Sequence, residues 1–165
     1  MSTITTFLQE ISYDAKLSKK VLDRLPEEHF NWKPHDKSFS LGQLAGHLAQ
    51  MYSWLPLMVH TKELDFSLPE NSKPAPLMSK AEILSALEKN VKDGLDALSG
   101  SSEEHLGEAW TLRNGNHVFF TMPRSVSIRS MVLNHIIHHR GQLTVYYRLL
   151  GVPVPALYGP TADEM

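Results

Sequence analysis

The chain is organised around one stretch, Asn134-His135-Ile136-Ile137-His138-His139-Arg140-Gly141-Gln142. It lies inside a predicted helix that runs from about residue 125 to about residue 150. Residues four apart in an α-helix lie on the same face, one turn from each other. The imidazoles of His135 and His139 should therefore point the same way, and together they could bind a single ion.

The spacing of apolar residues predicts that this face of the helix points inward. The residues that recur at steps of three and four are Ile128, Met131 or Val132, His135, His139, Gln142, Tyr146 and Leu149. An imidazole at an inward position needs a partner, because burying an unpaired polar group costs several kcal/mol. The two histidines are therefore the first candidates for a functional site.

Composition narrows the classes of protein that this chain can be. Its 165 residues fit a single domain, residues 1–165, with one core. The 16 Lys and Arg nearly balance the 18 Asp and Glu, and no basic run occurs, which argues against a nucleic-acid partner. With no cysteine, any metal must be held by His, Asp or Glu. Neither a signal peptide nor a membrane span is visible, so we expect a cytoplasmic protein without a membrane partner.

Three further amphipathic helices are predicted upstream of the histidine-rich one. The first covers about residues 4–25, with a capping box from Thr6 to Gln9, and ends before Pro26. The second runs from Leu41 to about Thr61 behind a capping box of Ser40 and Gln43, and Pro56 should kink it. The third follows a capping box of Ser79 and Glu82 and is closed by Gly100 as the C′ residue.

Two connections complete the predicted fold. Residues 62–78 form a long, proline-containing segment that suits a crossover between two helices pointing the same way. Residues 101–123 are not helical by pattern, and Asn114-Gly115 predicts a hairpin turn between strands near 110–112 and 118–120. The sequence thus indicates an all-α four-helix bundle with a small β-hairpin insertion before the last helix.

A third inward histidine strengthens the metal hypothesis. His47 lies three residues after Leu44 and four before Met51, on the inward stripe of the second helix. Three imidazoles with an open fourth position are typical of a catalytic metal site, and imidazole suits zinc, nickel, copper or iron(II). Taken alone, His47 is more simply a core histidine bonded to a carbonyl. His135 and His139 could equally well bond neighbouring polar groups.

Other residues of the last helix have two interpretations each. Gln142 could hydrogen-bond an imidazole or a metal-bound water, or lie at the rim of the bundle. Tyr146 could donate a hydrogen bond to a substrate, or simply belong to the core. His138 points about 100° away from His139 and is predicted to be packed or exposed. Arg140 could hold a neighbouring helix or a dimer partner. A second apolar stripe could form a dimer interface or pack within the chain; it comprises Val132, Ile136, Leu143 and Tyr147.

Two segments resemble the DinB/YfiT-like family. They are Leu41-Gly42-Gln43-Leu44-Ala45-Gly46-His47-Leu48-Ala49 and Asn134-His135-Ile136-Ile137-His138-His139-Arg140-Gly141-Gln142-Leu143. The resemblance extends over essentially the whole chain and implies a bundle with up-down-down-up topology. It also implies a divalent metal held by His47, His135 and His139. We expect this metal to be zinc or nickel. Homodimers are common in this family, and some members are enzymes that act with low-molecular-weight thiols.

We therefore expect a metal-dependent enzyme that transfers a low-molecular-weight thiol to an electrophilic small molecule. A bound divalent ion would lower the pKa of that thiol and so create a nucleophile near neutral pH. One alternative is a metal-dependent hydrolase, although no Asp or Glu on the ligand stripes supplies a base for it. The other is a non-catalytic metal-binding protein of a stress response. The sequence assigns no catalytic residue, and the three histidines are expected only as metal ligands.

Overall fold

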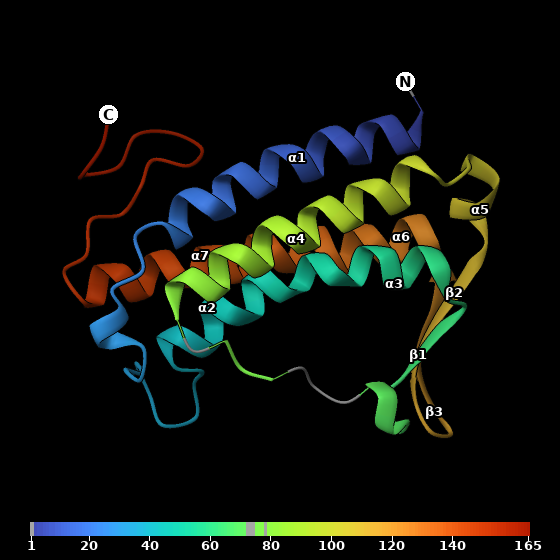
Figure 1. Cartoon of the computed structure of the whole chain (residues 1–165), viewed down its shortest axis with the longest axis horizontal. Coiled ribbons are helices and arrows are strands. Elements are labelled where there is room, and N and C mark those ends of the chain that lie inside the picture. Colours follow the sequence, from blue (N-terminus) through green and yellow to red (C-terminus); the bar gives the residue numbers. More distant parts are fainter. Residues whose placement is uncertain (1, 72–74, 78) are drawn as a thin grey trace.

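A computed structural model describes residues 2–71, 75–77 and 79–165. The fold is mostly helical, with a small three-stranded sheet. The long helical segments lie side by side along the molecule, and the sheet stands at one end (Figure 1). The helices are α1 (Thr3–Leu22), α2 (Leu41–Gln50), α3 (Trp54–His60), α4 (Lys80–Ser99), α5 (Glu103–Gly107), α6 (Arg124–Ile128) and α7 (Asn134–Leu149). In Figure 1, α1 and α6 begin near the sheet, whereas α2 and α4 begin at the opposite end.

Side-chain caps fix where the helices begin. The predicted capping boxes of α2 and α4 are confirmed, since Ser40 and Ser79 each accept a hydrogen bond from the backbone N–H three residues on. The predicted cap of α1 is wrong: Ser2 caps this helix by accepting from the N–H of Thr5. The other end of α1 is Leu22, three residues before the predicted boundary.

The C-terminal end of α4 also differs from the prediction. Gly100 is the C-cap residue itself, with a right-handed backbone at φ −82°, and not a left-handed C′ residue. Gly94, six residues earlier, allows close packing of α4 against α3. A Cβ atom there would lie 2.6 Å from Cδ1 and 3.1 Å from Cβ of Leu55, so a larger residue would force Leu55 to move.

The predicted second helix is interrupted. A 3₁₀ turn over Met51–Ser53 separates α2 from α3. Pro56, in the first turn of α3, has no N–H to donate to the carbonyl of Tyr52, four residues back, which explains a break at this point. The kink predicted at Pro56 is thus found as a break in the helix that lies before the proline, between α2 and α3.

The predicted fourth helix is interrupted as well. A π turn over Arg129–Leu133 connects α6 to α7, where the sequence pattern indicated one continuous helix. A π turn contains one more residue than an α turn, so it changes the rotational phase between the segments that it joins. The end of α7 is as predicted, because Gly151 follows it with a left-handed backbone at φ +73°.

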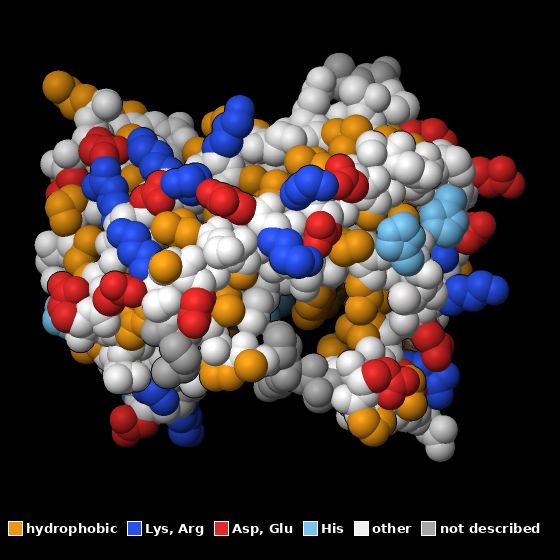
Figure 2. Space-filling model, in the orientation of Figure 1, with side chains coloured by type: hydrophobic (Ala, Val, Ile, Leu, Met, Phe, Trp, Pro, Cys, Tyr) orange, Lys and Arg blue, Asp and Glu red, His pale blue; other side chains and the backbone are white. Residues whose placement is uncertain are grey.

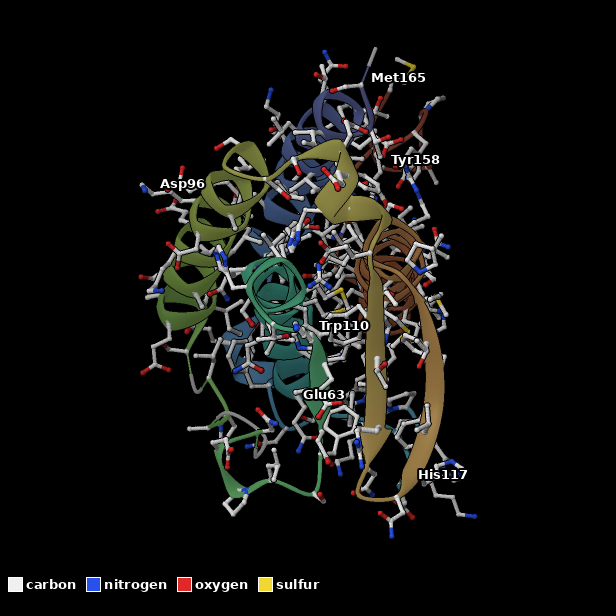
Figure 3. The ribbon with its side chains drawn as sticks, turned by 90° about the vertical axis from the view of Figure 1, so that its right-hand side faces the viewer. Glu63, Asp96, Trp110, His117, Tyr158 and Met165 are labelled. Atoms are coloured by element: carbon white, nitrogen blue, oxygen red, sulfur yellow. The ribbon has the colours of Figure 1, made fainter. Side chains whose placement is uncertain are left out.

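The predicted hairpin is confirmed. Strands β2 (Ala109–Asn114) and β3 (His117–Pro123) pair antiparallel, and Gly115 turns between them with φ +58°. Strand β1 (Glu63–Asp65), which the sequence analysis missed, pairs parallel with β2. The short helix α5 was missed too. Figure 3 shows Trp110 directed toward the helices and His117 at the outer tip; Trp110 is fully buried, and its Nε1 donates to Oγ1 of Thr61 over 3.2 Å.

The connection between α3 and α4 is described only in part. The crossover predicted over residues 62–78 includes residues 72–74 and 78, which lie outside the described residues. Within the described part it contains β1 and a 3₁₀ turn at Pro69–Asn71. None of the helices in the described ranges is long and apolar enough to cross a membrane.

The core face of the last helical segment differs from the prediction. Its fully buried apolar residues are Ile128, Val132, Ile136, Leu143 and Tyr147. The apolar stripe offered as a dimer interface therefore packs within the chain. Leu149, predicted to face the core, is 61% exposed. The stripe that carries His135 and His139 borders the core instead of forming it, because it lines the site described below.

The described residues form no concentrated basic patch on the face shown in Figure 2. Lys and Arg side chains alternate there with Asp and Glu. Three ion pairs at i, i+4 spacing contribute to this pattern: Lys19–Asp23 at the C-terminal end of α1, and Lys89–Asp93 and Lys92–Asp96 on α4. Exposed pairs of this kind stabilise a helix only slightly. Mixed charge on this face gives no electrostatic footprint for a nucleic acid.

Candidate metal centre

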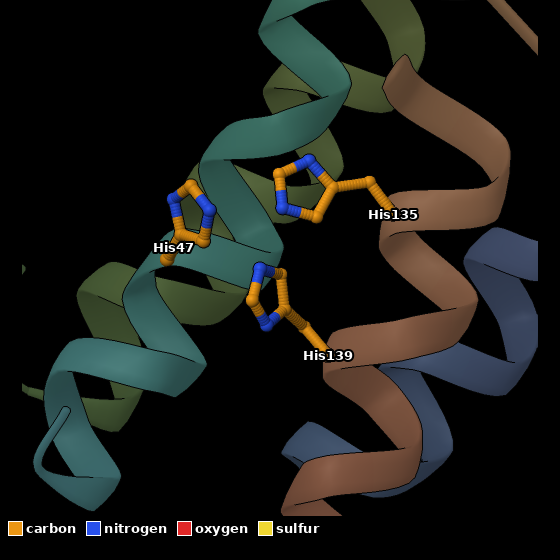
Figure 4. Close-up of side chains that lie close together, drawn as sticks. All are labelled: His47, His135 and His139. Carbon is orange, nitrogen blue, oxygen red and sulfur yellow. The ribbon is translucent and has the colours of Figure 1, made fainter. Parts of the chain in front are cut away.

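The fold brings His47, His135 and His139 together. His47 projects from α2, and the other two project from consecutive turns of α7 (Figure 4). One nitrogen from each ring lies within 4.8 Å of the other two, and ring centroids are 4.5 Å apart for His135–His139 and 4.8 Å for His47–His139. Among the residues that the structure describes, this is the one group of three or more metal-capable side chains, and it contains no carboxylate.

The two helices position these side chains through their apolar faces. On α2, Leu44 and Leu48 flank His47 in sequence and are buried in the core. On α7, Ile136 and Leu143 are buried in the core close in sequence to His135 and His139. His139 is buried, with 8% exposure, whereas His47 and His135 are half-buried. The group therefore lies where the core meets an opening to solvent.

The hydrogen bond of His139 identifies which of its nitrogens could bind a metal. Nδ1 lies 2.7 Å from Oε1 of Gln142. An amide oxygen only accepts, so Nδ1 donates and Nε2 keeps its lone pair. This Nε2 atom is buried and has no hydrogen-bond partner. Such an orphaned acceptor is rare in protein interiors, and a metal ion is a partner that satisfies it. The residues present thus fit a metal ion.

Burial keeps two of the imidazoles in the neutral form. It is the main cause that lowers the pKa of both His135 and His139. Hydrogen bonds that the imidazoles donate oppose this lowering of the pKa; His135 donates to the backbone of Met131 and His139 donates to the side chain of Gln142. A neutral imidazole is the form that binds a metal ion.

Aromatic residues surround the histidines. The ring of Phe39 lies 5.9 Å from that of His47, and the ring of Trp54 lies 6.2 Å from that of His135, both edge to face. Tyr146, considered above as a substrate donor, gives its hydroxyl hydrogen bond to the carbonyl of Phe39 over 3.2 Å. It also packs edge-on against Trp32 at 5.5 Å.

The remaining histidines do not join the group. His138 is exposed and not among the three, although its ring lies 5.0 Å from that of His139. His105 is partly buried: its Nε2 lies 2.7 Å from the carbonyl of Val59 and 3.0 Å from Nε of Arg124. His29, His35, His60 and His117 lie elsewhere, outside the three-histidine group.

Arg140 holds a neighbouring helix, the first of the two roles considered above, through a buried ion pair with Asp14 of α1 that the sequence analysis did not predict. Arg140 is 1% exposed and bonds Oδ1 of Asp14 at 2.5 Å, the carbonyl of Asp14, and Oγ of Ser18. Ser18 in turn bonds the hydroxyl of Tyr52, and the hydroxyl of Tyr158 also contacts Arg140. A signal was present, because Arg140 follows Ile136 by four residues on the buried face of α7. Asp14 and Ser18 show the same spacing on α1.

Comparisons with known protein families, curated proteins and solved structures all relate this chain to DinB-like proteins or to a Bacillus protein of similar length. A sequence model of the DinB family matches residues 1–165. The curated protein YrdA of Bacillus subtilis (strain 168), itself uncharacterized, is 25% identical over 166 residues, which is 98% of this chain and 92% of YrdA. A DinB-like protein from Bacillus cereus ATCC 10987 has a similar structure, with a TM-score of 0.72, 27% identity, and coverage of 92% of this chain and 95% of that one.

A second solved structure supports the fold alone. It is the DinB-like protein YjoA from Bacillus subtilis, with a TM-score of 0.66. The two chains are 16% identical, and the match covers 93% of this chain and 99% of YjoA.

Proposed function

Because this chain belongs to the DinB family, we propose that it binds one divalent metal ion through His47, His135 and His139. We further propose that it transfers a low-molecular-weight thiol to an electrophilic small molecule. Zinc and nickel are the expected ions, since imidazole nitrogen suits both. A bound divalent ion supplies Lewis acidity that favours the deprotonated form of a thiol. The cytoplasm, where such thiols are kept reduced, is the proposed location.

One observation carries the metal proposal. His139 Nε2 is buried, holds a lone pair and lacks a hydrogen-bond partner, and two further imidazoles lie beside it. The chain's own contribution is orientation: Gln142 accepts from Nδ1 and so holds the ring of His139 in one tautomer. His135 and His139 resist protonation because they are partly removed from water.

The two alternatives have less support. A hydrolase needs a general base near its water nucleophile, and no carboxylate joins the histidine group among the described residues. A purely structural metal site would be closed by a fourth protein ligand. Here two of the three histidines are half-buried, which favours a centre that solvent and substrate can reach.

Metal titration of protein purified without a polyhistidine tag tests the ligand assignment. We expect one zinc or nickel ion per chain by calorimetry, and loss of stoichiometric binding in His47→Ala, His135→Ala and His139→Ala. His138→Ala is the matched control and should bind nearly as the parent does, because His138 lies outside the three-histidine group. The assignment is wrong if His138→Ala abolishes binding while His135→Ala retains it. A screen of several thiols with the loaded protein then tests the transfer reaction.

We also propose that the protein forms a homodimer through the outer face of α7. Ile137, Val145 and Leu149 are 43%, 57% and 61% exposed and recur at steps of eight and four. Gly141 lies between the first two, with open space where a Cβ would be, so another helix could approach closely there. Light scattering should give twice the chain mass at micromolar concentration, and Val145→Asp should give the monomer. A parent protein that is monomeric under these conditions would refute the dimer.

A further inference from the structure

We infer that the electrophile is a ring-bearing molecule whose flat aromatic group packs against the aromatic side chains beside the three histidines, Phe39 and Trp54. This inference deepens the proposed function and rests on it for the identity of the reaction. Its evidence is separate, because it comes from the aromatic side chains around the histidines and not from the metal-binding nitrogens.

The two aromatic walls come from different elements and contact different histidines. Phe39, in the connection before α2, meets the ring of His47 at an interplanar angle of 70°. Trp54, the first residue of α3, meets the ring of His135 at the same angle. Neither ring is buried: Phe39 is 48% exposed and Trp54 is half-buried. Both walls can therefore contact an incoming molecule.

The Phe39 wall is held in place before any ligand arrives. Tyr146 donates its hydroxyl hydrogen bond to the Phe39 carbonyl, and Trp32 packs edge-on against Tyr146. Immediately after Phe39, the capping box of Ser40 fixes the start of α2. Since Tyr146 lies on α7, seven residues after His139, the same helix positions both a candidate ligand and this wall.

Aromatic walls select for ring shape in addition to apolarity. Edge-to-face and offset contacts between rings contribute beyond the area that they bury. They should favour a flat ring over a saturated group of the same size by roughly two- to tenfold in affinity. A saturated ring is the more apolar of the two, so burial of apolar area alone would favour the opposite order.

The reaction expected for a benzylic halide is a balanced substitution. The thiol sulfur forms a bond to the benzylic carbon, and the carbon–bromine bond breaks with its electron pair, which leaves as bromide. The thiol proton passes to water. The co-reactant is the low-molecular-weight thiol of the proposed function, and no oxidant or reductant is required.

A binding experiment tests the subsite without any turnover. Zinc-loaded, tag-free protein is titrated with benzyl alcohol and with cyclohexylmethanol, and chemical shifts are followed by NMR. We expect benzyl alcohol to bind more tightly by roughly two- to tenfold. Phe39→Leu and Trp54→Leu should each reduce this preference while zinc binding is retained. Phe119→Leu, which removes an aromatic ring of 51% exposure on β3, is the matched control and should keep it.

A kinetic experiment separates this inference from the proposed function. Benzyl bromide and (bromomethyl)cyclohexane react with L-cysteine, with and without the protein, and each rate is divided by its own uncatalysed rate. We expect a larger acceleration for benzyl bromide. If no thiol of the screen described above gives acceleration but benzyl alcohol still binds preferentially, the transferase proposal fails and the aromatic subsite stands. If cyclohexylmethanol binds as tightly as benzyl alcohol, or Phe119→Leu removes the preference as Phe39→Leu does, the subsite is overturned.

Discussion

The two helical segments that carry the histidines are interrupted in opposite ways. The α2 segment is followed by a tightened 3₁₀ turn at Met51–Ser53, and the α7 segment is preceded by a widened π turn at Arg129–Leu133. His47 lies four residues before the first interruption, and His135 lies two residues after the second. Both His47 and His135 thus lie on regular α-helix close to an irregular turn. That turn determines in which direction the neighbouring helical side chains point.

The two segments also differ in what anchors them. Every buried residue of α2 is glycine or apolar. The buried residues of α7 include Arg140, which directly follows His139 in the sequence. Arg140 forms an ion pair with Asp14 of α1. Apolar packing tolerates small shifts of the side chains. A buried ion pair requires one geometry, and removal of one partner strongly destabilises the fold because the other charge stays buried and unpaired. The difference indicates that the two sides of the site will respond differently to substitution.

The largest effect should come from breaking the polar anchor of α7. Asp14→Ala leaves Arg140 buried without its counter-charge, so we expect a loss of about 3–5 kcal/mol in the free energy of unfolding, measured with urea. Arg140→Met removes the charge and should cost less. Asp23→Ala, which breaks an exposed pair with Lys19 on the same helix, is the control and should cost about 0.5 kcal/mol or less. Equal losses for Asp14→Ala and Asp23→Ala would contradict a special role for this anchor.

A smaller effect should come from converting the π turn into an α turn. Deletion of Ser130 rotates the preceding segment by about 100° relative to α7 and turns Ile128 away from the core. Exposure of that isoleucine should cost about 2–3 kcal/mol, measured by chemical unfolding. Ser130→Ala is the control, because this side chain bonds only the Val126 and Ser127 carbonyls and, weakly, the sulfur of Met122. If the deletion variant is as stable as Ser130→Ala, the π turn does not determine how the residues before it are rotated relative to α7.

The next effect concerns metal affinity alone. Gln142→Leu removes the acceptor for His139 Nδ1, so the ring can change tautomer and orientation. We expect zinc affinity to fall by about 10- to 100-fold in chelator competition, with little change in unfolding. Gln142→Glu retains an acceptor oxygen and should lose less. Unchanged affinity in Gln142→Leu would remove Gln142 from the site.

The smallest effect should come from the start of α2. Ser40→Ala removes the cap and should cost about 1 kcal/mol in the free energy of unfolding. Ser79→Ala removes the same kind of cap from α4, so it should cost a similar amount. Only the Ser40 variant should also weaken zinc binding, because α2 carries His47. Equal zinc affinities for the two variants would show that the cap does not position His47.

Local signals in the sequence were the ones that predicted structure correctly. The capping boxes at Ser40 and Ser79 and the turn at Asn114-Gly115 each depend on a few neighbouring residues, and all three are present. The juxtaposition of His47, His135 and His139 followed from helical spacing on two inward stripes together with a family resemblance. The caps and the turn could be predicted because their physical cause lies within one turn of chain, whereas the meeting of His47 with the other two histidines also required the family resemblance.

What the sequence did not reveal depends on distant partners. Strand β1 has three residues, too few for a recognisable pattern, and exists because β2 pairs with it. The π turn has no sequence signature comparable to Pro56. The side chain of Arg140 could not be oriented without knowing that Asp14 faces it from α1. The phase of α7, and with it the exposure of Leu149, depended on the same tertiary contacts.

The extended C-terminal segment has a consequence for any shortened form of the protein. Tyr158 contacts the buried Arg140 through its hydroxyl and also lies under its guanidinium, while Asp163 and Glu164 bond Arg148 and Arg24. Proteolysis before residue 158 would remove the tyrosine that contacts this buried guanidinium. Water would then reach a guanidinium next to His139 in the chain. Trimming these last residues, a routine step in preparing proteins for crystallisation, would alter the interior and not merely an end.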